Sequence, residues 1–495
     1  MKKTIMITIV SALALSLLAV CVLAPSSEAE SIGDASAATE PVLVSGATRS
    51  AGNQTETTAS TDQSAGTEID VSVSKRDASG EYDASEAIAL SPGDDLTIRS
   101  AGVYILSGVY ENQMIVIEAG EEDKVQLVLE NAALINENGP AIYVRSADKV
   151  FITAAEGTVN TISDGAGYSL TDGDTTLDAA VFSREDLTIN GAGKLTINGN
   201  CKHAVVSKDD LVITAKDLTV NAENVGLNGK DSVTLSEATV SITAGSDGIR
   251  SENGSDAEKG YVAVLYSALR IVSGKDGIQA ETVFIAENAA ITVTSGGGSS
   301  MRSSDASEST KGIKAGVSVM IKGGIYQIEA LDDAIHTNGS ILISDGEITI
   351  QSRDDGIHAN EMVEISGGTL SITACEGIEA TYIRISGGDI TISASDDGIN
   401  AARKSANYTP TVEISGGTIS ITMGAGDTDG IDVNGNIIIT GGTISVNGNS
   451  SFDYDGSATF TGGIVYVNGQ HVTTLPNQMM GGGMGGFGGG RGRRP

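Results

Sequence analysis

Carboxylates recur at one position of a repeated phrase in the second half of the chain. Each stands before a small residue and an isoleucine, as in the segments DDAIH, DDGIH and DDGIN. The residues at this position are Asp247, Asp276, Lys311, Asp333, Asp355, Glu376, Asp397 and Asp429. Apart from Lys311, all of these side chains are carboxylates, which suggests cation binding because carboxylate oxygens are the ligands that hard divalent cations prefer.

The phrase returns at a nearly constant interval. Its small residues Gly312, Ala334, Gly356, Gly377 and Gly398 are separated by 22, 22, 21 and 21 residues. Between them lie pieces such as ISGGTLSITA, in which Ile and Leu alternate with polar residues, as in short strands joined by Gly-rich turns. We therefore expect an all-β fold, a single-stranded right-handed parallel β-helix (a solenoid) with rungs of about 21–22 residues. A leucine-rich repeat has a similar period, but its leucine framework is absent from the sequence.

Stacking of these rungs would place the carboxylates in one column, widened by Asp332, Asp354, Asp396 and Asp427. Two carboxylates ~4.8 Å apart repel by about 3.5 kcal/mol at an effective dielectric constant of ~20. Calcium oxygens lie about 2.3–2.6 Å from the ion, so one ion bridges two such rungs. The alternative is that these residues only form Asp-Gly turns. Whether bound ions would be structural or part of a ligand site stays open.

A second column lies two positions after the small residue. It comprises Arg250, Gln279, Lys314, His336, His358, Glu379, Asn400 and Asp432. Strand alternation turns these side chains away from the inward isoleucines, so we expect an exposed strip beside the carboxylates. We take His336, His358, Glu379 and Asn400 as candidate ligand-binding residues; the alternative is an ordinary solvated face. The sequence has no Ser-His-Asp order, CxxC pair or phosphate-binding loop.

The formal net charge of −34 argues against a nucleic-acid partner and suits a secreted, cation-collecting surface. Residues 1–29 resemble a secretory signal, with Lys2 and Lys3 before an apolar run. No second apolar span follows, so no membrane-spanning domain is expected in the mature protein, which we expect outside the cell or on its surface. Cys21 offers a weak match to a lipid-anchor site.

Three further segments follow the signal. Residues 30–67 are rich in Ser, Thr and Ala and predict a flexible linker. Residues 68–475 carry the strand-like pieces and predict the β-helix, beginning with the alternation EIDVSV. Residues 476–495 are rich in Gly, Met and Arg and predict a flexible tail that ends in RGRRP.

Several phrases together resemble the secreted bacterial carbohydrate-binding domain-containing family, a right-handed β-helix similar to calcium-dependent polysaccharide lyases. They are SAGVYILSG, KVQLVLENAALI, GPAIYVRSADKVFITAAEGTVNTISDG, the repeated DDGIHAN and ISGGT, and the closing DTDGIDVNGNIIITGG with FDYDG. The resemblance spans roughly residues 69–469 and implies binding of pectin-like or cellulose-like wall polysaccharide with calcium as cofactor. It implies calcium ligands at Asp332, Asp333, Asp354, Asp355, Asp396, Asp397, Asp427, Asp429, Asp453 and Asp455. Lys311 and Glu376 depart from the family's acidic phrase, and Glu376 joins the predicted ligands as a carboxylate of the column.

We predict an extracellular calcium-binding protein that holds cell-wall polysaccharide without catalysis. The first alternative is a calcium-dependent pectate-type lyase, which needs a base to remove the proton beside a uronate carboxyl group. Lys314 is the candidate for that base. The second alternative is a structural surface adhesin, for which the linker and the repeats suffice.

Overall fold

The computed structural model describes residues 69, 71–94, 96–168, 177–301, 308–425 and 428–477. The chain divides into two units, Met1–Gln63 and Ser64–Pro495, and every described residue belongs to the second. The predicted secretory segment, the linker and the tail from residue 478 onward lie outside the described residues. Among the predicted site residues, Asp427 lies outside them too.

A short helix, α1 (Lys75–Ser79), precedes the strands. Ser74 caps it, and its buried Asp77 pairs with Lys149 at 2.9 Å and accepts a hydrogen bond from Thr188. Of the predicted alternation EIDVSV, residues 71–73 form no strand, and the first strand of the described residues begins at Ile88. Across the described ranges, no helix has the length and apolar character needed to span a membrane.

In the part of the chain that the structure describes, thirty-eight strands belong to one sheet. The first third contains β1 (Ile88–Leu90), β2 (Thr97–Ile98), β3 (Gly102–Glu111), β4 (Ile115–Glu118), β5 (Lys124–Asn136), β6 (Ile142–Ser146), β7 (Lys149–Ala154), β8 (Val159–Asp164), β9 (Ala179–Ser183), β10 (Asp186–Gly191), β11 (Lys194–Gly199), β12 (His203–Ser207) and β13 (Asp210–Ile213). The middle contains β14 (Asp217–Ala222), β15 (Leu227–Gly229), β16 (Ser232–Ser236), β17 (Thr239–Ala244), β18 (Ile249–Ser251), β19 (Tyr261–Leu265), β20 (Ala268–Ser273), β21 (Ile278–Ala280), β22 (Val283–Ser295), β23 (Ile313–Ala315), β24 (Ser318–Ala330) and β25 (Ile335–Thr337). The last third contains β26 (Ser340–Ser352), β27 (Ile357–Ile365), β28 (Thr369–Ala374), β29 (Ile378–Ile385), β30 (Asp389–Ala394), β31 (Ile399–Ala401), β32 (Thr411–Ile414), β33 (Thr418–Met423), β34 (Asp429–Val433), β35 (Asn436–Asn447), β36 (Ser450–Tyr454), β37 (Ala458–Val467) and β38 (Gln470–Val472).

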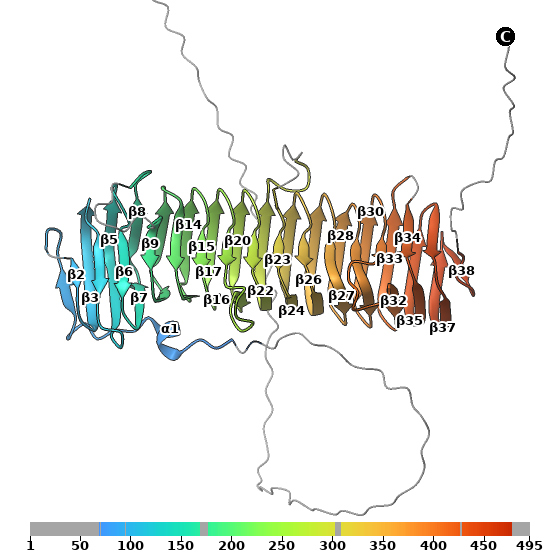
Figure 1. The fold of residues 1–495 in the computed structure, drawn as a ribbon, viewed down its shortest axis with the longest axis horizontal. Helices are drawn as coiled ribbons and strands as arrows, with labels where there is room; N and C mark the ends of the chain where they lie inside the picture. The colour runs from blue at the N-terminus through green and yellow to red at the C-terminus, as the bar shows by residue number, and fades with distance from the viewer. Residues whose placement is uncertain are drawn as a thin grey trace, which may run out of the picture. The chain divides into compact units, whose positions relative to one another are not determined.

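Most strands pair in parallel with the strand two or three places further along the chain, as β10 does with β13 and β22 with β24. We call one passage of the chain around the core, from a residue to its register partner, a circuit. Circuits vary in length, since Ile142 faces Val181 whereas Ile378 faces Ile399. Within the described unit, Figure 1 shows the strands following one another in chain order from β2 to β38. The last pair, β37 and β38, is antiparallel.

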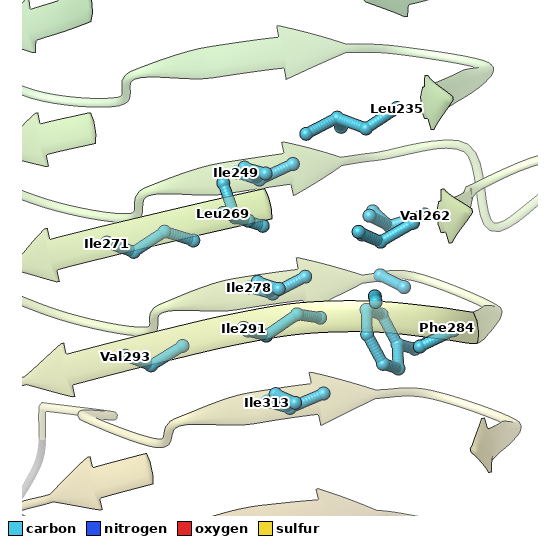
Figure 2. Packing of buried hydrophobic residues seen from close by; sticks show 14 of the residues in the cluster. Leu235, Ile249, Val262, Leu269, Ile271, Ile278, Phe284, Ile291, Val293 and Ile313 are labelled. Carbon is cyan, nitrogen blue, oxygen red and sulfur yellow. The ribbon is translucent and has the colours of Figure 1, made fainter. Parts of the chain in front are cut away.

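The core consists of inward side chains that repeat from circuit to circuit. Figure 2 shows Ile249, Ile278 and Ile313 one after another on β18, β21 and β23, and all three are fully buried. Burial of each such side chain contributes about 1.5–3 kcal/mol relative to exposure. The alternation of Ile and Val with polar residues thus specifies which face of each strand points inward.

Several strands bend around a corner without leaving the sheet. β22, β24 and β26 each run for 13 residues. Asn288 in β22 and Gly323 and Gly324 in β24 have positive φ angles of 47°, 82° and 106°, which let the backbone turn while pairing continues. Strand pieces that the sequence suggested as separate are therefore joined.

The predicted fold class needs correction. The described chain is all-β, as expected, but it forms one closed, barrel-like parallel structure that surrounds a single core. It is not the open right-handed solenoid of three short strands per 21–22 residues. One physical reason is that corner residues with positive φ let consecutive strand segments remain paired in one sheet. The other is that insertions make some circuits longer than 21–22 residues.

Candidate functional site

The side chains of the second predicted column stand opposite one another on successive circuits. Lys314 on β23 faces His336 on β25, which faces His358 on β27. The series continues through Glu379 on β29 to Asn400 on β31, and from there to Asp432 on β34 and Asp453 on β36. The two imidazole rings stack with centroids 4.8 Å apart. We call this series the polar column.

The prediction that this column is an exposed strip is wrong. Glu379 is only 5% exposed and Asn400 9%, and the two histidine side chains are 13–16% exposed. The two histidines are covered because they lie against Asp333, Asp355 and Glu379, and Asn400 lies against Glu376. Lys404, in the loop after β31, closes over Glu379 at 2.6 Å.

The carboxylates before the small residues form their own series, the acidic column. In four of them, one oxygen accepts a hydrogen bond from a backbone N–H of the next circuit. These bonds run from Asp276 to Asp247, Lys311 to Asp276, Asp355 to Asp333, and Asp429 to Asp397, at 2.8–3.2 Å. Bonds from N–H groups to ionised oxygens favour the charged form, so they offset part of the repulsion between circuits.

Basic side chains neutralise the middle of the acidic column. Lys311 pairs with Asp332 at 2.8 Å and with Asp333 at 2.7 Å, and His336 lies 2.8 Å from Asp333. Burial would raise the pKa of Asp333, but these partners hold it well below its ordinary value. Lys311, which interrupts the acidic pattern in the sequence, is thus the counterion of the next circuit.

His358 lies between two carboxylates, with Nδ1 2.7 Å from Asp355 and 2.9 Å from Glu379. Burial opposes its charged form, yet the hydrogen bonds to both carboxylates raise the pKa of His358 to about 10. The pKa of Asp355 is raised to about 6 by burial and by the charges of Asp333 and Glu379. At neutral pH His358 is therefore an imidazolium that holds the acidic neighbours together.

Further along the column, the carboxylates lie beside other carboxylates. Burial and neighbouring carboxylates raise the pKa of Glu376 to about 7, of Asp397 to about 6 and of Asp432 to about 7. For Asp432 the neighbours are Asp397, Asp429, Asp453 and Asp455. Among the described residues, no ion pair joins Asp397, Asp432 or Asp453 to a basic side chain. We call Asp397, Asp429, Asp432 and Asp453 the C-terminal acidic cluster.

Asn400 borders this cluster. Its Nδ2 donates to Glu376 at 2.9 Å, whereas its buried Oδ1 has no hydrogen-bond partner among the described residues. A buried amide oxygen without a partner is costly, and it suits a ligand sphere made of oxygen atoms.

Other predicted metal ligands fall into separate groups. Asp332, Asp333 and Asp354 bring ligand atoms within 4.8 Å of one another, as do Asp333 with the two histidines and Asp355 with His358 and Glu379. In each group at least one of the buried carboxylates already pairs with Lys311 or a histidine. Asp396 and Asp455 are exposed beside the C-terminal acidic cluster.

Lys314 lies 3.4 Å from Asp276 and is half-buried. Five register steps separate it from Asp432, about 24 Å at ~4.8 Å per circuit. A base must lie within hydrogen-bond reach of the proton that it removes. Lys314 therefore cannot act on a ligand held at the C-terminal acidic cluster.

Sequence reasoning missed three parts of the site. Lys404 lies in an insertion, where nothing in the repeat predicts its contact with Glu379. The sequence pattern places Asp432 only in the second column, whereas its register with Asp453 makes it part of the C-terminal acidic cluster. A further acidic group lies on the earlier circuits of β10 and β13 and comprises Asp186, Asp209 and Asp210. It is not part of the repeated phrase, so the repeat does not predict it.

A family profile and a curated relative carry the same description. The profile of the family described as carbohydrate-binding domain-containing protein matches residues 92–356 and 351–466, more than half of the chain. A carbohydrate-binding domain-containing protein of Acetivibrio thermocellus is 36% identical over 129 residues, which is 26% of this chain and 45% of the relative. This chain thus spans less than half the length of that curated relative.

One solved structure is also similar, a polysaccharide lyase-like protein from C. thermocellum in a gadolinium derivative. It is 33% identical, with a TM-score of 0.40, and the match covers 43% of this chain and 91% of that one. On the family profile, which covers both the polar column and the C-terminal acidic cluster, the chain belongs to the carbohydrate-binding domain-containing protein family.

Proposed function

We propose that this protein acts outside the cell or at its surface, where it binds a pectin-like or cellulose-like wall polysaccharide through calcium and does not cleave it. The observation that carries the proposal is the C-terminal acidic cluster. Its carboxylates stand in register on adjacent circuits, and within the described residues the last ion pair of the polar column joins Lys404 to Glu379.

Calcium suits this cluster for two reasons. Two oxygens across one calcium ion are about 4.6–5.2 Å apart, close to the ~4.8 Å between circuits. The Oδ1 of Asn400 supplies a neutral oxygen at the border of the cluster. Asp397, Asp429, Asp432 and Asp453 would hold the ion, and the ion would supply positive charge for glycan hydroxyl or carboxylate oxygens.

The positions of the basic residues support the proposal that the protein binds without cleavage. Lys314 lies about 24 Å from Asp432 by register. Lys404 lies nearer to the C-terminal acidic cluster. Burial opposes the charged form of Lys404, but Glu379 raises its pKa above the ordinary value. A lysine with a raised pKa stays protonated and is a poor base at neutral pH.

The test is retention of the protein on pectate gel and on cellulose with calcium or with chelator, at high salt that screens exposed basic side chains. We expect retention with calcium and its loss with chelator, and loss of calcium-dependent retention in D432N/D453N. The matched control is D345N/D389N, which removes two exposed carboxylates elsewhere on the sheet. Equal retention with and without calcium would contradict the calcium part, and no retention on either polymer would favour the adhesin alternative.

The same samples decide on catalysis. Release of unsaturated uronides, followed by ultraviolet absorbance, would overturn the non-catalytic part of the proposal. Should such release occur, unchanged release by a Lys314→Ala variant would exclude Lys314 as the base.

A further inference from the structure

Four basic side chains occupy one position on four successive circuits in the first half of the sheet. Arg145 follows Val144 on β6, and Arg184, Lys208 and Lys230 follow the register partners Ser183, Ser207 and Gly229. The backbone bonds Arg184 N–H to Val144 O, Lys208 N–H to Ser183 O and Lys230 N–H to Ser207 O continue this register at 2.9–3.0 Å. All four residues are exposed. We call them the basic ladder.

An aromatic pair positions the first three heads. Tyr143 and Phe182 are buried and meet edge to face with centroids 6.1 Å apart. The guanidinium groups of Arg145 and Arg184 lie 5.2 and 5.8 Å from the Tyr143 ring, and Arg184 Nε donates to its hydroxyl group at 2.9 Å. Lys208 Nζ lies 5.5 Å from the Phe182 ring. These contacts limit the freedom of long side chains, which lowers the entropic cost of binding an anion.

The ladder has defined ends. Glu118 meets Arg145 at 3.4 Å on one side, and Glu252 takes the equivalent position on the circuit after Lys230. Asp231, beside Lys230, is neutralised by Lys259 at 2.5 Å. Four cations at ~4.8 Å intervals span about 14 Å, in a chain whose net charge is −34.

We infer that the basic ladder binds a linear polysaccharide with one carboxylate on each sugar, lying along the stacking direction of the circuits, without calcium. The inference rests on the proposed function and names the charge and placement of its ligand. Arginine forms bidentate bonds with carboxylate groups, and a regular row of cations suits a polymer with one charge per monomer. Duplex nucleic acid carries a charge every ~1.7 Å, so this short row would leave most of its charges against an acidic protein.

The experiment measures retention of the full chain on immobilised polygalacturonate in chelator at low salt. We expect wild-type protein to be retained, at least tenfold weaker binding by R184E/K208E, and a further decrease for wild type as salt is raised. The matched control R270E/K322E makes the same charge change at two exposed residues outside the ladder and should bind as wild type does. R184Q/K208Q serves if charge reversal prevents folding, which the melting temperature reports.

The inference is overturned if wild-type protein is not retained in chelator, or if R184E/K208E is retained as well as wild type. It is also overturned if wild-type protein is retained equally on fully methyl-esterified polymer, or if it prefers duplex DNA to polygalacturonate. Calcium separates this inference from the proposed function. If wild-type protein is retained with calcium but not in chelator, binding by the basic ladder is contradicted, whereas the proposed calcium site is supported. If R184E/K208E is retained with calcium but not in chelator, both the basic ladder and the calcium site are supported.

Discussion

At the scale of single residues, the middle of the acidic column is balanced by the protein itself. Asp333 faces Lys311 and His336, and His358 bridges Asp355 and Glu379. A column that looks uniform in sequence therefore divides into a neutralised part and the C-terminal acidic cluster. The division depends on a few basic side chains and not on the repeated phrase.

His358 tests this balance. His358→Gln leaves Asp355 and Glu379 close together without their shared cation, so we expect a loss of about 3 kcal/mol in the free energy of unfolding. Chemical denaturation in chelator measures it. Adding Glu379→Gln should recover part of the loss, because the repulsion is removed.

The control for this substitution is His471→Gln, which changes an exposed histidine on β38. It should unfold as wild type does. A His358→Gln variant as stable as wild type would mean that the imidazolium bridge contributes little.

At the scale of strands, the small residue before each inward isoleucine is required by close approach of successive circuits. A Cβ atom built on Gly377 would lie 2.4 Å from Gly398 O and 2.4 Å from the Cγ2 of Ile392. Both contacts are far below van der Waals distance. The repeated glycine thus reports how closely the circuits pack.

We therefore expect Gly377→Val to destabilise the protein by about 3 kcal/mol, the upper end of the usual cost of overpacking. Thermal unfolding measures the effect. Gly167→Val is the matched control, because nothing lies within 4 Å of a Cβ at Gly167. Equal melting temperatures for the two variants would show that the circuits can move apart at Gly377.

The sequence predicts the strands and their register better than the contacts between columns. Alternating Ile and Val identify the inward face, and the spacing of Ala334 and Gly356 places His336 over His358. The corners are not predictable in the same way, because a positive φ at Asn288 depends on the sheet around it. Lys404 reaches Glu379 only through the fold of an insertion, which has no repeat to follow.

At the scale of the whole molecule, the acidic charge makes stability depend on pH and calcium. Glu376, Asp397 and Asp432 have folded-state pKa values raised to about 7, 6 and 7, so the folded chain holds protons that the unfolded chain releases. Their contribution is lost as pH rises through these values. The bridge of His358, with its pKa of about 10, changes stability in the same direction above about pH 6.5.

In chelator we therefore expect the melting temperature to fall between about pH 5 and pH 8. With calcium the fall should shrink, because the ion takes the place of the released protons. Differential scanning calorimetry measures both series. A melting temperature that rises with pH in chelator would contradict the raised pKa values, and Asp432→Asn should flatten the curve.

The antiparallel pairing of β38 with β37 has a consequence for assembly. β37 is the last strand of the parallel series, and its side away from β35 is a backbone edge to which another chain could add. β38 occupies part of that edge, through Val465 with Val472 and Val467 with Gln470. Gln470→Pro/Val472→Pro removes two backbone donors, so we expect end-to-end filaments by light scattering, whereas Thr474→Pro should leave single particles. The final hairpin therefore prevents end-to-end association of chains.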